Sequence, residues 1–164
     1  MSRLTKNPQV PVELMAAIPK ADRLLAWAAY RDGLIAVTDN NFVDTGELNP
    51  TLIPWSIALQ ARWEPPMLTL VTQVDSQSVA ATQTWTLAEP GKIPSSVRDR
   101  VTHAVVVDKA YNLPNAGNVR FVARRDGESV TWITVVDDLG ATQSAAGARD
   151  VAAALSELKS IFGI

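Results

Sequence analysis

The chain has 164 residues, enough for one domain that buries a core without disulfides or a metal. It contains no cysteine, which excludes thiolate nucleophiles, disulfides and cysteine metal sites. The net charge of -2 argues against nucleic acid or anionic lipid as a default partner, because both favour a basic face. We expect a cytoplasmic protein with no signal peptide or transmembrane segment, since no apolar run approaches the ~20 residues that a membrane helix needs.

The first part of the chain is rich in proline, and we expect residues 1–20 to form an N-terminal arm. A short helix from Val12 to Ile18 fits between two of its prolines. Residues 21–164 show no internal repeat, low-complexity tract or change in composition. We therefore expect this remainder to be a single domain.

Tight turns divide the next segment into three strands. Leu24 to Tyr30 and Leu34 to Thr38 are predicted to pair as a hairpin around Arg31–Gly33. Phe42–Val43 begins a short third strand after the turn Asp39–Asn41. A polar loop from Asp44 to Pro50 follows it.

The run from Ile53 to Trp63 has an apolar residue at every odd position. This period of two predicts one long strand with a covered apolar face. Pro65–Pro66 should end it, because proline cannot donate to a strand ladder. Two further strands are predicted from Met67 to Val74 and from Ala80 to Leu87.

The last part of the chain combines a second β-meander with helices. Ser95 or Ser96 is expected to cap a short helix, with Asp99 at capping-box spacing from Ser96. The meander then comprises strands from Val105 to Leu113, Val119 to Arg125 and Val130 to Val136. Residues 145–162 are predicted to form an amphipathic C-terminal helix, because its apolar residues lie four, three and four apart: Val151, Leu155, Leu158 and Phe162.

Antiparallel strands joined by short turns indicate an α+β protein, mainly antiparallel β, in the form of a barrel or a curled sheet. The C-terminal helix has one apolar stripe, which suits it to plug an open barrel end or cover one sheet face.

Five short apolar motifs stand out along the chain: Leu24–Trp27, Gly33–Val43, Leu52–Ile57, the Val97/Val101 pair and Trp132. Together they resemble an uncharacterised actinobacterial protein family with a pleckstrin-homology-like (PH-like) domain. The resemblance implies a PH-like barrel or curled sheet and no activity. The chain departs from the usual plan after Leu87, because the helix and strands from Ser95 to Val136 are additional.

Related phosphoinositide-binding domains cluster basic residues around the first hairpin. Here that region offers Lys20, Arg23 and Arg31, with Asp22 and Asp32 between them. Because so little positive charge is in surplus, we expect no phosphoinositide binding.

The strongest interaction candidates lie in the second meander. Arg120, Arg124 and Arg125 form a basic spot, and Lys109 shares a face with Arg120 and Arg124 if the register allows. Solvated basic residues that guard a strand edge are the common alternative. Trp63 is the tryptophan that we expect to be most exposed, since it precedes Pro65–Pro66.

Residues suited to catalysis are few. Asp137 and Asp138 follow a strand and could share a proton or bind a cation, although strand neighbours point to opposite faces. A turn with an anion at the start of a helix is the commoner role. His103 is the only histidine, and no nucleophile motif accompanies it. No glycine-rich phosphate loop is present, and we expect no cofactor and no metal.

These observations favour a non-catalytic interaction module that binds a protein or peptide, through a sheet edge or an open barrel end. One alternative is a small-molecule or lipid-binding barrel, with its ligand between the helix and the tryptophan-lined sheet. The other is an enzyme that uses Asp137 and Asp138. No nucleic acid partner is expected, and self-association is left open.

Overall fold

The computed structural model describes residues 9–164, and the predicted arm lies partly outside them, at residues 1–8. Within the described residues the elements follow in this order: α1 (Val12–Ala17), β1 (Leu24–Tyr30), β2 (Gly33–Thr38), β3 (Asn41–Asp44), β4 (Thr51–Pro54), the 3-10 helix η1 (Trp55–Ile57), β5 (Ala58–Glu64), β6 (Met67–Thr72), β7 (Ala81–Thr86), α2 (Ile93–Ala104), β8 (Val105–Leu113), β9 (Gly117–Asp126), β10 (Ser129–Val136), α3 (Leu139–Gln143) and α4 (Ala145–Phe162).

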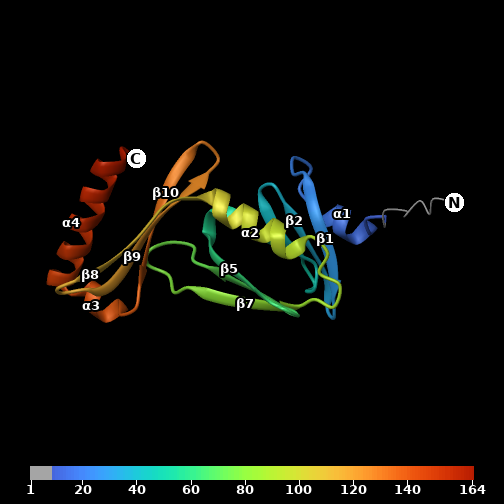
Figure 1. Cartoon of the computed structure of the whole chain (residues 1–164), viewed down its shortest axis with the longest axis horizontal. Coiled ribbons are helices and arrows are strands. Elements are labelled where there is room, and N and C mark those ends of the chain that lie inside the picture. The colour runs from blue at the N-terminus through green and yellow to red at the C-terminus, as the bar shows by residue number, and fades with distance from the viewer. Residues whose placement is uncertain (1–8) are drawn as a thin grey trace. The chain divides into compact units, whose positions relative to one another are not determined.

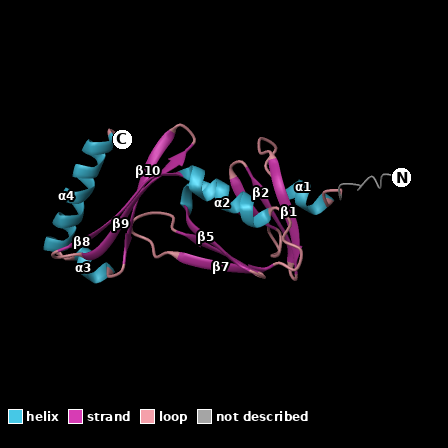
Figure 2. Cartoon of the chain, viewed as in Figure 1, coloured by secondary structure: helices cyan, strands magenta, loops and turns pink. Residues whose placement is uncertain are grey.

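The predicted α+β class, mainly antiparallel with a C-terminal helix, is confirmed (Figure 2). The strands of residues 9–164 form three sheets, with the orders β1-β2-β3-β4, β5-β6-β7 and β10-β9-β8. They form no closed barrel, so the barrel is the wrong one of the two predicted alternatives, a barrel or a curled sheet. Each sheet ends in two edge strands, whereas a barrel pairs its first strand with its last and has no edge.

The predicted single strand from Ile53 to Trp63 is also wrong. β4 ends at Pro54, whose missing N–H cannot extend the ladder with β3, and η1 follows at once. β5 then carries the chain into a different sheet. The alternation of apolar residues in the sequence continues through this break. Ile53 and Trp55 are both buried, although only Ile53 lies in a strand.

The chain divides into two units, which are described separately. Among the described residues, the first comprises 9–54, Arg62–Thr69 and Thr84–Asp99, and the second comprises Trp55–Ala61, Leu70–Gln83 and Arg100–Ile164. In the first unit α1 packs on the β1–β4 sheet and buries Leu14 completely, against Ala36 and Val43. The helix between two prolines therefore contributes to the core of this unit.

The half-buried carboxylate of Asp44 links three parts of the first unit. Asp44 Oδ1 accepts hydrogen bonds from the Tyr30 hydroxyl at 2.6 Å and from the Gly46 N–H at 2.8 Å. Asp44 Oδ2 accepts one from Trp85 Nε1 at 2.9 Å. Burial, and then the hydrogen bond to Asp44, raise the pKa of Tyr30 above its ordinary value. The Trp85 ring also packs on Phe42, with ring centroids 4.7 Å apart.

The second unit is built around the predicted β8–β9–β10 meander and helix α4, whose bounds match the prediction. Ser144 caps α4 by accepting from the Gly147 N–H, and Gly163 ends it in the left-handed conformation. Three of the four stripe residues face the sheet, whereas Phe162 is exposed. The core between α4 and the sheet contains Leu158 of the helix together with Ala116, Val119 and Phe121.

Candidate interaction site

The two faces of the β8–β9–β10 sheet have different environments. Side chains alternate between the faces, and α4 packs on the face that carries Val119 and Phe121. The opposite face carries the even-numbered residues of β8 and β9, among them Ala110 and Arg120, which lie directly across from each other. Figure 1 shows α4 beside the long strands β8 and β9.

The outer edge of β10 is occupied by side chains of the loop that follows β6. Gln73 Nε2 donates to the Thr134 carbonyl at 3.0 Å, and the Thr134 N–H donates to Ser76 Oγ at 2.9 Å. Gln73 is buried. Both backbone groups of Thr134 are therefore satisfied at a position where an added strand would otherwise pair.

The contacts of Thr134 also fix the direction of the backbone groups of β8. In an antiparallel ladder, the N–H and C=O of successive residues point alternately to the two sides. The N–H and C=O groups of Thr134 point away from β9. Those of its partner Phe121 therefore point towards β8, where they bond to Lys109. It follows that the neighbours of Lys109, Asp108 and Ala110, and also Asn112, direct their N–H and C=O groups to the outer edge.

The middle of β8 is exposed on both faces. All five residues from Asp108 to Asn112 are exposed, and β8 is the longest edge strand of residues 9–164. An open groove of about 440 Å³ adjoins this segment. Its lining comprises Ala110, Tyr111, Asn112, Asn118, Val119, Arg120, Val135 and Asp137.

An ion pair crosses the groove face. Arg120 Nε donates to Asp108 Oδ1 at 2.6 Å, and Arg120 Nη2 donates to Asp108 Oδ2. The hydrogen bond from Arg120 lowers the pKa of Asp108, and the same bond raises the pKa of Arg120. Arg120, predicted as a free interaction residue, is thus paired within its own sheet.

Arg124 shares this face but is completely buried, which contradicts its expected place in an exposed basic spot. Its Nη2 donates to the Trp55 carbonyl at 2.9 Å, so η1 covers this end of the face. In the described part of the chain Nε and Nη1 are buried without a hydrogen-bond partner. Burial lowers the pKa of Arg124 to about 10, still far enough above neutral that the guanidinium stays charged at physiological pH.

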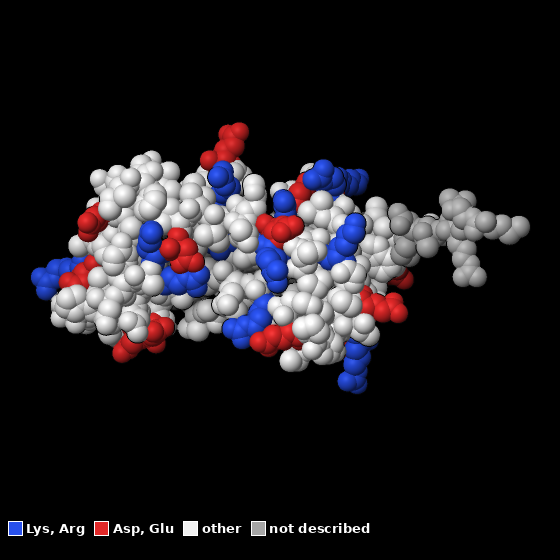
Figure 3. Space-filling view, in the orientation of Figure 1, with Lys and Arg blue, Asp and Glu red and all other residues white. Residues whose placement is uncertain are grey.

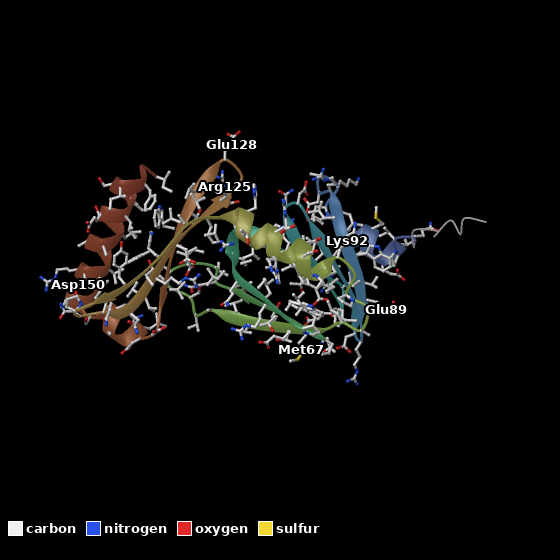
Figure 4. The ribbon with its side chains drawn as sticks, viewed as in Figure 1. Met67, Glu89, Lys92, Arg125, Glu128 and Asp150 are labelled. Atoms are coloured by element: carbon white, nitrogen blue, oxygen red, sulfur yellow. The ribbon has the colours of Figure 1, made fainter. Side chains whose placement is uncertain are left out.

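The other basic residues of this sheet do not form a cluster. Lys109 lies opposite Phe121, and therefore on the other face from Arg120 and Arg124, so the predicted shared face is wrong for it. Arg125 lies near the tip of the β9–β10 hairpin, close to Glu128 in the chain (Figure 4). On the side of the molecule that Figure 3 shows, basic and acidic side chains are interspersed.

The two adjacent aspartates have separate surroundings. Asp138 caps α3, accepting from the Ala141 N–H at 3.1 Å, which matches the commoner role expected for this pair. Asp137 lines the groove and is exposed. In the first unit, Trp63 is half-buried on β5. In the second unit, His103 is exposed and lies in the last turn of α2.

The basic residues near the first hairpin are separated by a strand. Arg23 precedes β1 and Arg31 follows it, and seven strand residues span roughly 20 Å. Asp22 accepts hydrogen bonds from Thr38, Asn40 and Asn41 and ties the β2–β3 turn to the start of β1. Lys20 and Arg23 therefore do not share one site with Arg31.

Sequence reasoning did not single out Ala110, Tyr111 or Asn112. A signal for them is present, because Asp108–Asn112 lacks an apolar residue at every second position, unlike β9 and β10. A strand without an apolar face is typical of a sheet edge.

Comparison with protein-family models, curated proteins and solved structures gives no match in any of the three. Across residues 9–164, no helix is long and apolar enough to cross a membrane. The same residues contain no group of three His, Asp or Glu side chains that could hold a metal ion.

Proposed function

We propose that the protein is an interaction module that binds an extended segment of a partner protein by strand addition along β8. One observation carries this proposal: the backbone groups of Asp108, Ala110 and Asn112 face the outer edge of an exposed nine-residue strand. An added strand gains affinity from main-chain hydrogen bonds and specificity from alternate side chains.

The contrast between the two edges of this sheet supports the choice of β8. Gln73 and Ser76 fill the outer edge of β10, whereas the groove leaves space beside Ala110 and Asn112. Proteins commonly protect edge strands with proline, bulges or covering loops. β8 contains no proline, and its one irregularity lies near its start, between Val105 and Val107.

Replacement of Ala110 by proline should weaken binding at least tenfold while the fold is kept. The Ala110 N–H points outward, so proline removes a donor to the partner without breaking a bond to β9. A displayed library of random peptides would be selected on the wild-type protein, and the affinities of the selected peptides would be measured on both variants. We expect at least a tenfold loss, about 1.4 kcal/mol, for one main-chain bond lost together with a steric clash.

Ala110→Thr is the matched control, because it keeps the N–H and suits a strand. It should retain the selected peptides. Peptides that bind Ala110→Pro as tightly as the wild type would show that they do not use this edge. Asn112→Pro removes the next outward N–H and provides a second test.

A cavity favours a second candidate function, the binding of an uncharged small molecule. It measures about 310 Å³ and lies between α4, α3, β10 and the loop after β6. Its lining has an apolar part, with Val136, Val151 and Leu155, and a polar part, with Gln77 and Gln143. Such a combination is typical of small-molecule sites, and 310 Å³ is at their lower limit.

We also propose that the chain contains a PH-like domain and that the protein is cytoplasmic. The first is supported by the antiparallel β1–β4 meander, which carries the motifs Leu24–Trp27 and Gly33–Val43. The second rests on the absence of cysteine from the chain.

A further inference from the structure

Lys109 is the charged residue of the β8 edge that is left without a partner. Asp108, its neighbour, is held by two hydrogen bonds from Arg120 on the groove face. Lys109 is exposed, stands on the opposite face and forms no ion pair within residues 9–164. The edge therefore presents one unneutralised positive charge to an added strand.

The next side chain on the same face is aromatic. Tyr111 lies two residues after Lys109, is 39% exposed, and packs edge-on against Phe121, with ring centroids 6.0 Å apart. In an added strand, the residues opposite Lys109 and Tyr111 would also lie two positions apart and on this face. Opposite charges and aromatic pairs are the favourable cross-strand combinations.

We infer that the segment bound along β8 carries an acidic residue opposite Lys109 and, two positions away, an aromatic or β-branched residue opposite Tyr111. This inference rests on the strand-addition function proposed above. Charge complementarity selects the acidic residue, because a basic residue at that position would face Lys109 directly. The residues that alternate with these two lie on the groove face, over Ala110, where the adjacent Asp108 is already neutralised by Arg120.

The test uses the full chain and three synthetic peptides of the form Ser-Val-Thr-X-Thr-Phe-Ser, with X as Glu, Gln or Lys. Binding is followed by NMR titration of the backbone amides of β8. On the wild type we expect the Glu peptide to bind about three- to tenfold more tightly than the Lys peptide. On Lys109→Glu the order should reverse.

Lys92→Glu is the matched control, since it makes the same charge change at an exposed lysine of the first unit (Figure 4). It should keep the wild-type order. Equal affinity of the three peptides, with shifts at β8, would overturn this inference and leave strand addition intact. If no peptide shifts the β8 amides at its solubility limit, both proposals fail.

Discussion

Replacement of Leu158 by aspartate should lower the free energy of unfolding by about 4 kcal/mol or more. Leu158 of α4 is 2% exposed and packs on Val119 and Phe121 of β9. Truncation of a buried leucine alone costs about 2–5 kcal/mol, and a buried carboxylate without a partner adds to this loss. Urea denaturation followed by circular dichroism measures the change.

Phe162→Asp on the same helical stripe is the control for Leu158→Asp. Phe162 is 43% exposed, so the substitution should change stability by no more than about 0.5 kcal/mol. Equal losses for the two variants would mean that α4 does not bury this stripe at Leu158.

Replacement of Asp44 by alanine should destabilise the protein by about 3 kcal/mol. The half-buried carboxylate accepts from Tyr30 and Trp85, and a donor left unsatisfied away from solvent costs about 1–3 kcal/mol. The Tyr30 hydroxyl also packs closely on Gly46, where an added Cβ would lie 1.7 Å from it. Thermal and urea denaturation both report the loss.

Glu47→Ala provides the comparison for Asp44→Ala, since it removes an exposed carboxylate from the loop that follows β3. It should leave stability within about 0.5 kcal/mol of the wild type. A wild-type melting temperature for Asp44→Ala would show that Tyr30 and Trp85 do not depend on this carboxylate.

The parts of the fold that the sequence predicts well are those whose local pattern is compatible with only one type of secondary structure. The four-three-four spacing of Val151, Leu155, Leu158 and Phe162 fits a helix and no strand, and α4 has the predicted bounds. The run from Ile53 to Trp63 is different, because its alternation is compatible with a strand while a 3-10 turn interrupts it. That turn contains Trp55, whose carbonyl is held by Arg124, sixty-nine positions away.

The site was predicted less well, for a related reason. Arg120 and Arg124 lie on one face as expected, but their partners Asp108 and Trp55 come from elsewhere in the chain. Arginine is normally exposed, so burial of Arg124 has no local signal. The occupied edge of β10 depends on Gln73 and Ser76, which approach Thr134 only through the tertiary fold. The β8 edge could have been recognised from Asp108–Asn112.

Residue-resolved amide hydrogen exchange of the free protein tests the central claim, that β8 presents an open edge. We expect an alternation along the strand. The amides of Asp108, Ala110 and Asn112 point outward and should exchange rapidly, whereas those of Lys109 and Tyr111 are bonded to β9 and should be protected. Addition of the Glu peptide should then slow the three outward amides. Uniform protection from Asp108 to Asn112 in the free protein would show that the edge is already covered, and would contradict the account.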